Sequence, residues 1–140
     1  FDYTAIGDNV NLASRLEGMN KVYGSHIIAT QSTYEKVRDK FIFREIDAVA
    51  VKGKKIPVKI YELMDYADGD KSKVELALEF NRGVKLYQER RFVDARNIFE
   101  AILKKYPEDG PAKLYKERCE DYIKNPPPPD WDGVYVAKTK

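Results

Sequence analysis

Residues 3–16 read YTAIGDNVNLASRL, and this stretch decides the fold that the sequence predicts. Its first residues are typical of a short β-strand, and the Gly-Asp-Asn trio at 7–9 supplies a turn and helix N-caps. Apolar side chains then recur at spacings of four, three and four residues, which predicts a helix from residue 10 to about residue 22. They are Leu12, Leu16, Met19 and Tyr23. A strand, a tight turn and a helix therefore follow in direct succession.

The next stretch repeats this strand–helix alternation. Residues 26–30 read as a buried strand, and a second helix is expected from Ser32, where Ser32 and Glu35 form a capping box. Its inward-facing residues are predicted to be Tyr34, Val37 and Phe41.

Two further strands complete the first part of the chain. Residues 41–51 and 55–63 read as strands joined by a hairpin-like turn at 52–54. Pro57 places the second of them at a sheet edge or marks its start, because proline cannot donate to a ladder. The order β-α-β-α-β-β predicts an α/β (α+β) fold for residues 1–64.

The remainder of the chain changes in character. Residues 65–73 are polar and read as a linker, and residues 74–124 show helical periodicity. One helix carries Ala77, Phe80, Val84 and Tyr87, the next carries Phe92, Ala95, Phe99, Ile102 and Tyr106, and a third is expected over 111–123. Residues 125–140 form a tail with four prolines, read as a spacer rather than a ligand for an SH3-type domain. Its apolar residues, which could dock on the domain, are Trp131, Val134, Tyr135 and Val136.

The composition narrows the class of protein. The 140 residues are 43% hydrophobic and 34% charged with a net charge of +2, which describes a globular protein and gives no reason to expect nucleic-acid binding. The single Cys119 cannot form an internal disulfide, and no apolar run is long enough to span a bilayer. Phe1 is neither an initiator methionine nor the start of a signal peptide. We expect a cytoplasmic fragment of a longer protein, whose other segments could anchor it in a membrane.

Two motifs carry a resemblance to a known family. The run Val10-Asn11-Leu12-Ala13-Ser14-Arg15 resembles the V-N-x-A-x-R helix of class III adenylate and guanylate cyclases, and residues 51–62 resemble the closing hairpin of the same domain. The resemblance covers residues 1–64 and implies the C-terminal part of a ferredoxin-like cyclase domain.

The chemistry of the signature helix agrees with that resemblance. Asn11 and Arg15 are four residues apart, so on a helix their side chains share one face. Cyclisation requires the ribose to be held in line and requires negative charge on the α-phosphate oxygens to be stabilised. An amide suits the first task and a permanently charged guanidinium the second. The resemblance assigns these catalytic roles to Asn11 and Arg15.

Two further residues are expected to bind substrate. Thr4 stands where the family reads the purine, and a threonine there resembles the adenylate cyclase subgroup that uses a hydroxyl to accept from the adenine amine. Lys52 matches the lysine that contacts the terminal phosphates. The resemblance thus favours ATP as substrate, with GTP as the alternative.

The family's metal site has no counterpart in this sequence. Class III cyclases hold Mg²⁺ or Mn²⁺ on two aspartates in a strand that reads roughly F-x-D-I-x-G-F, and no such segment occurs here. Their sites form across a dimer, so the resemblance implies a second cyclase subunit as partner. We expect the isolated chain to be inactive.

The helical part resembles a different family. Residues 76–109 are similar to one tetratricopeptide repeat, with Gly83, Ala95, Phe99 and Pro107 at the usual small, aromatic and proline positions and Glu79 where an aromatic residue is usual. A single repeat cannot bury its own face. It is therefore expected to pack within the chain or on a second subunit, or alternatively to bind a protein partner. In that alternative the whole chain is a non-catalytic interaction module.

Overall fold

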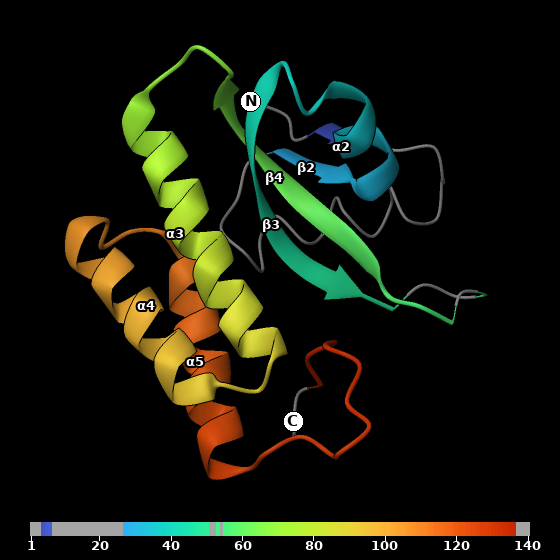
Figure 1. The fold of residues 1–140 in the computed structure, drawn as a ribbon, viewed down its shortest axis with the longest axis vertical. Helices are drawn as coiled ribbons and strands as arrows, with labels where there is room; N and C mark the ends of the chain where they lie inside the picture. The colour runs from blue at the N-terminus through green and yellow to red at the C-terminus, as the bar shows by residue number, and fades with distance from the viewer. Residues whose placement is uncertain (1–3, 7–26, 51–52, 54, 137–140) are drawn as a thin grey trace.

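The computed structural model describes residues 4–6, 27–50, 53 and 55–136, and within them it is a four-stranded sheet with helices on both faces (Figure 1). The strands run in the order β1-β2-β4-β3. Their bounds are Thr4–Ile6 for β1, Ile27–Thr30 for β2, Phe41–Val49 for β3 and Val58–Tyr66 for β4. The helices are α2 at Gln31–Val37, α3 at Lys71–Gln88, α4 at Phe92–Lys105 and α5 at Gly110–Lys124. The predicted mixed α/β class is confirmed.

Strands β1 and β2 are parallel, with Thr4 opposite Ile27 and Ile6 opposite Ala29. A parallel pair needs a crossover of about a dozen residues or more, usually a helix. Residues 7–26 connect these two strands and are long enough for that purpose. The helix expected over 10–22 lies outside the described residues and stays a prediction.

Strands β3 and β4 form the expected antiparallel hairpin, from Phe41 opposite Tyr66 to Val49 opposite Val58. Pro57 immediately precedes β4, where its missing N–H costs no ladder bond. Because β4 also pairs with β2, it lies inside the described sheet. Of the two alternatives for Pro57, the strand start is therefore confirmed and the sheet edge is wrong.

Helix α2 begins one residue earlier than its sequence suggested. Its N-cap is Thr30, the last residue of β2, whose hydroxyl accepts a hydrogen bond from the Thr33 N–H at 3.4 Å. The predicted start at Ser32 with a Ser32–Glu35 capping box is wrong, because the chain turns from strand to helix without a loop and Thr30 already occupies the cap position.

The sheet buries an apolar layer on each face, since neighbouring residues of a strand point to opposite sides. On one face α2 covers Ala29, Phe43 and Tyr61, and the Tyr34 ring stacks on Tyr61 at 3.8 Å between centroids. On the other face Ile28, Ile46 and Ile60 share a core with α3, α4 and α5. Figure 1 shows these three helices together, away from α2.

The helices α3 and α4 pack closely because small residues lie at their contact. A Cβ atom on Gly83 would come within 2.7 Å of the Phe99 ring, so only glycine permits this approach. Phe99 is fully buried and contacts the rings of Phe80 and Tyr115. Eight of the nine expected inward positions are buried in α3 and α4, whereas Tyr106 follows the end of α4 and is half-buried. The tetratricopeptide resemblance itself stays a prediction.

Short connections join the sheet to the helices. Since β4 ends at Tyr66 and α3 begins at Lys71, residues 65–66 and 71–73 of the expected linker belong to these two elements. In the part of the chain that the structure describes, no helix is both long and apolar enough to cross a membrane.

The tail docks on the helices, as its apolar residues suggested. The Trp131 ring packs against Tyr87, Phe92 and Tyr122. The Arg90 guanidinium donates to the carbonyl oxygens of Pro127 and Pro128 at 2.7 and 2.9 Å. Arg90 adopts a left-handed backbone at φ 68°, just beyond the end of α3.

Candidate functional site

The structure describes one of the four expected site residues, and only its backbone. Thr4 opens β1, the strand at one end of the described sheet, in register with Ile27. Asn11, Arg15 and Lys52 lie outside the described residues, so their predicted positions stay predictions.

The directions of the strands nevertheless show at which end of the sheet the signature at 10–15 and the hairpin motif at 51–62 each begin. Strands β1, β2 and β3 all run the same way, because β4 is antiparallel to both β2 and β3. The chain therefore leaves β1 at Ile6, toward Asn11 and Arg15, at the same end of the sheet where it leaves β3 at Val49, toward Lys52. With two strands between β1 and β3, these exits are about 14 Å apart across the sheet at about 4.8 Å per strand, and Val49 lies a further three β4 residues, about 10 Å, beyond the level of Ile6 along the strands.

A buried cluster of charges joins β3, β4 and the start of α5. Arg44 donates to Glu62 Oε1 at 2.8 Å and, through both terminal nitrogens, to the two Asp109 carboxylate oxygens at 3.0 and 2.9 Å. The Arg44 residue is only 3% exposed, and its guanidinium lies 4.7 Å from the centre of the Phe80 ring. Asp109 is also the N-cap of α5 and accepts from the Ala112 N–H.

The charges of this cluster are mutually supporting. Burial alone would lower the pKa of Arg44, but attraction to Glu62 and hydrogen bonding to Asp109 outweigh it and raise the pKa above its usual value. Since every part of the fork-shaped guanidinium is directed at a carboxylate, this cluster is a structural junction between the sheet and the helices.

A second buried ion pair joins the C-terminal half of β3 to α5. Arg118 Nη1 lies 2.8 Å from Asp47 Oδ2, and both side chains are less than a tenth exposed. The Tyr115 hydroxyl donates to the Ile46 carbonyl oxygen and lies 3.2 Å from Asp47 Oδ1. From the tail, the Tyr135 ring covers the Arg118 guanidinium at 4.6 Å.

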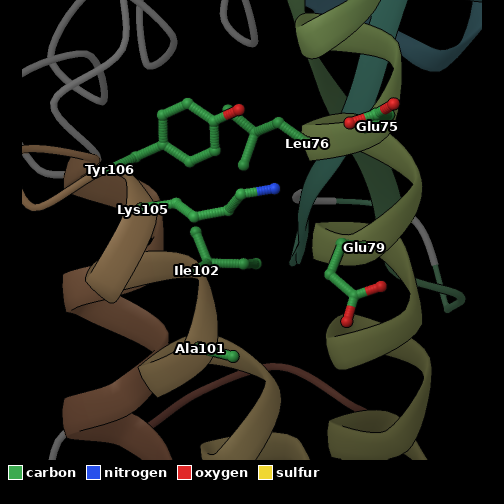
Figure 2. Close-up of a pocket in the computed structure, with 7 residues that line it drawn as sticks. All are labelled: Glu75, Leu76, Glu79, Ala101, Ile102, Lys105 and Tyr106. Carbon is green, nitrogen blue, oxygen red and sulfur yellow. The ribbon is translucent and has the colours of Figure 1, made fainter.

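A groove on the helices lies between α3 and α4 (Figure 2). It measures about 290 Å³, and its lining residues are Glu75, Leu76, Glu79, Ala101, Ile102, Lys105 and Tyr106. Figure 2 shows the Lys105 side chain reaching from α4 into the space between the helices, with Glu75 and Glu79 on α3. The mixture of two carboxylates, one ammonium and an apolar floor lacks the convergent polar groups of a catalytic pocket.

The described residues do not fit a metal site. Among them, no group of three or more His, Cys, Asp or Glu side chains could hold an ion.

Sequence reasoning missed the charged residues of both junctions. Arg44 and Asp47 are three positions apart in β3, so a regular strand would direct them to opposite faces, whereas the register shift between Glu45 and Asp47 lets both bond to α5 and its N-cap. Asp109 did carry a signal, because it precedes Gly110 and Pro111 as an N-cap should. Its ion pair with Arg44, 65 residues away, had no local signal.

Comparison with known proteins gives the family context. No family model matches the chain. A Dictyostelium discoideum protein named adenylate cyclase, terminal-differentiation specific, is 39% identical over 126 residues, which cover 86% of this chain. The chain is similar to adenylate cyclases. Adenylate cyclase 1 of Rhizobium meliloti is 44% identical over 62 residues, and an adenylate cyclase of Anabaena cylindrica is 46% identical over 65, each covering 44% of the chain.

The extents of these matches are informative in two ways. The chain spans only 6%, 9% and 13% of the three adenylate cyclases, respectively. Residues 1–64 are less than half of the chain, so the Dictyostelium match must extend well into the helices. The similarity to adenylate cyclases is thus not confined to the segment with the signature.

Proposed function

We propose that this chain is a fragment of an adenylate cyclase that converts ATP to cyclic AMP and pyrophosphate in cytoplasmic signal transduction. The observation that carries the proposal is the 39% identity to a protein named adenylate cyclase over most of the chain. The signature at 10–15 and the hairpin motif at 51–62, in that order, support it. Residues 1–64 supply the cyclase part in this proposal, and 74–124 the helical part.

The reaction assigns a task to each expected site residue. The ribose 3′-oxygen loses its proton and bonds to the α-phosphorus, while the bond from that phosphorus to pyrophosphate breaks. Asn11 holds the ribose in line, and Arg15 stabilises the charge that grows on the α-phosphate oxygens. A pre-aimed donor of this kind contributes about 3 kcal/mol to transition-state stabilisation, a factor of a hundred or more in rate.

Substrate recognition uses the two other residues. Thr4 accepts from the adenine amine, and Lys52 binds the terminal phosphates. The shared sheet end of the exits from β1 and β3 supports one nucleotide lying across it, with its base on the β1 side and its phosphates on the β3 side.

The remaining chemistry belongs to other segments. Mg²⁺ or Mn²⁺ would activate the 3′-hydroxyl and neutralise the leaving group, held by aspartates of another segment in a second subunit of a homodimer. On this proposal the 140-residue chain alone makes no cyclic AMP from ATP and Mn²⁺. Measurable turnover by the isolated chain would contradict the division of the site.

The direct test is the turnover of ATP and GTP by the purified full-length protein that contains this chain. Cyclic AMP formed from ATP at least tenfold faster than cyclic GTP from GTP would support the proposal. Preference for GTP would indicate the guanylate cyclase alternative, and turnover of neither would refute a cyclase.

A non-catalytic role for the helices is the second candidate, and the groove between α3 and α4 is the observation in its favour. Capture of a specific protein by the full chain, lost on Lys105→Glu, would support it. No capture above the level of that variant would count against it.

A further inference from the structure

A cavity of about 370 Å³ lies between the C-terminal tail and α5. Figure 1 shows this tail as a loop beyond the end of α5. Ligand sites in proteins usually measure about 300 to 1,000 Å³, so the cavity is large enough to receive a side chain of another molecule. Aromatic rings, prolines and valines form its walls, together with two carboxylates. The lining residues are Tyr122, Pro127, Pro128, Asp130, Trp131, Asp132, Val134 and Val136.

Hydrogen bonds hold the walls of this cavity in place. The Arg90 guanidinium donates to the carbonyl oxygens of Pro127 and Pro128. The Trp131 backbone N–H donates to the Pro128 carbonyl oxygen at 3.0 Å, and the Trp131 indole N–H donates to the Val134 carbonyl oxygen at 2.7 Å. A cavity that is formed before the ligand arrives reduces the entropy cost of binding.

The indole of Trp131 is fixed as firmly as the backbone around it. Its ring makes edge-to-face contacts with the rings of Tyr87, Phe92 and Tyr122, at 5.3 to 5.8 Å between centroids. It also contributes to the lining of the cavity. Among aromatic side chains, tryptophan attracts a cation most strongly to its face.

The charge of the cavity has a single sign. Of the residues that line it, Asp130 and Asp132 are the charged ones, and both are exposed. One Asp132 oxygen accepts from the Val134 N–H at 3.1 Å, while Asp130 has no hydrogen-bond or ion-pair partner among the described residues. Arg90 is bonded to carbonyl oxygens and pairs with neither carboxylate. An indole beside two unneutralised carboxylates is complementary to a cation.

We propose that this cavity binds an arginine side chain of a partner protein, with the guanidinium against the Trp131 ring and within reach of Asp130 and Asp132. A planar guanidinium stacks on aromatic rings and bonds carboxylates through several N–H groups, whereas a compact ammonium does neither as well. The aliphatic part of the arginine lies along the prolines and valines. The inference is independent of the proposed cyclase chemistry, because none of these residues is assigned to the nucleotide.

The test uses the fluorescence of Trp131, the one tryptophan of the 140-residue chain. The probe is Nα-acetyl-arginine methylamide, and the control is the citrulline analogue, which has nearly the same shape and no charge. We expect a saturable change of emission with the arginine probe, and binding of the citrulline analogue that is at least about tenfold weaker.

Three variants of the full chain locate the binding site. Asp130→Asn and Asp132→Asn keep the size of the side chain and an acceptor oxygen, and each should raise the dissociation constant about two- to fivefold. Asp68→Asn is the matched control, because it removes the same charge from an exposed turn before α3, whereas the cavity lies near the opposite end of that helix. It should leave the dissociation constant unchanged.

Each result supports or overturns the inference. Saturable binding of the arginine probe that weakens in the two cavity variants and not in Asp68→Asn would support it. A linear decrease of emission without saturation, equal binding of the citrulline analogue, or equal weakening in all three variants would overturn it. Tighter binding of the lysine analogue than of the arginine probe would overturn the choice of arginine as the ligand.

Discussion

Replacing Arg44 by methionine tests the junction between the sheet and the helices. Arg44 has three hydrogen bonds of 2.8 to 3.0 Å to Glu62 and Asp109, and its side chain is 3% exposed. Methionine fills most of the volume but leaves two carboxylates in a buried site without the guanidinium. Removing one partner of a buried ion pair costs about 3 to 5 kcal/mol. The buried cation–π contact of the guanidinium with the Phe80 ring adds up to about 2 kcal/mol to that loss.

Urea unfolding of the chain, followed by far-UV circular dichroism, measures this change. The control is Arg82→Met, since Arg82 makes a 2.8 Å ion pair with Glu79 while its side chain is 59% exposed. An exposed pair contributes about 0 to 1 kcal/mol, so the control should hardly move the midpoint. Small and equal losses of unfolding free energy in the two variants would refute the reasoning that burial makes the loss of the Arg44 ion pairs strongly destabilising.

Three further predictions concern the helices and the tail. Gly83→Ala should destabilise by about 1 to 2 kcal/mol, because overpacking against the buried Phe99 ring outweighs the helix propensity gained; a higher urea midpoint would contradict this. Burial raises the pKa of Cys119 to about 12 from 9.0. Between these pH values the thiol therefore stays protonated in the folded state and loses its proton in the unfolded state. The free energy of unfolding should therefore fall as pH rises above 9, by up to about 1.4 kcal/mol per pH unit more in the wild type than in Cys119→Ala. Equal slopes of unfolding free energy against pH in the two proteins would count against this prediction. Arg90→Ala should let the tail detach before the helices unfold. The fluorescence of Trp131, the one tryptophan, should then change at a lower urea concentration than the circular dichroism signal does. Coincidence of the two unfolding transitions would contradict this prediction.

Local patterns predicted the elements of this fold well. The hairpin of β3 and β4 and the inward faces of α3 and α4 were apparent because period-2 and period-3.6 patterns depend only on neighbours in the chain. The start of α2 was misplaced because Thr30 and Ser32 are both good caps, and where β2 ends decided between them.

Contacts between residues far apart in the sequence could not be predicted from such local patterns. The composition change after residue 64 predicted a helical part but not its contacts with the sheet, where Ile28 and Ile60 share one core with Phe80 and Tyr115 of the helices. Charged residues within β3 were not foreseen as buried, because the residues that pair with them come from 18 to 71 positions later in the chain.

The expected site itself was found from motifs rather than from packing. Thr4 is placed by its strand, whereas Asn11, Arg15 and Lys52 lie outside the described residues. Their roles depend on the resemblance and on the common exit of β1 and β3 at one end of the sheet.

The measurement that bears most directly on the proposed chemistry is the rate of cyclic AMP formation by the full-length protein that contains this chain, carrying Arg15→Ala, beside Arg15→Lys and wild type. We predict that kcat falls at least about a hundredfold in Arg15→Ala and is only partly recovered by the lysine, while the thermal midpoint of unfolding is unchanged. Turnover within about threefold of wild type in Arg15→Ala would contradict the assignment of charge stabilisation to this residue.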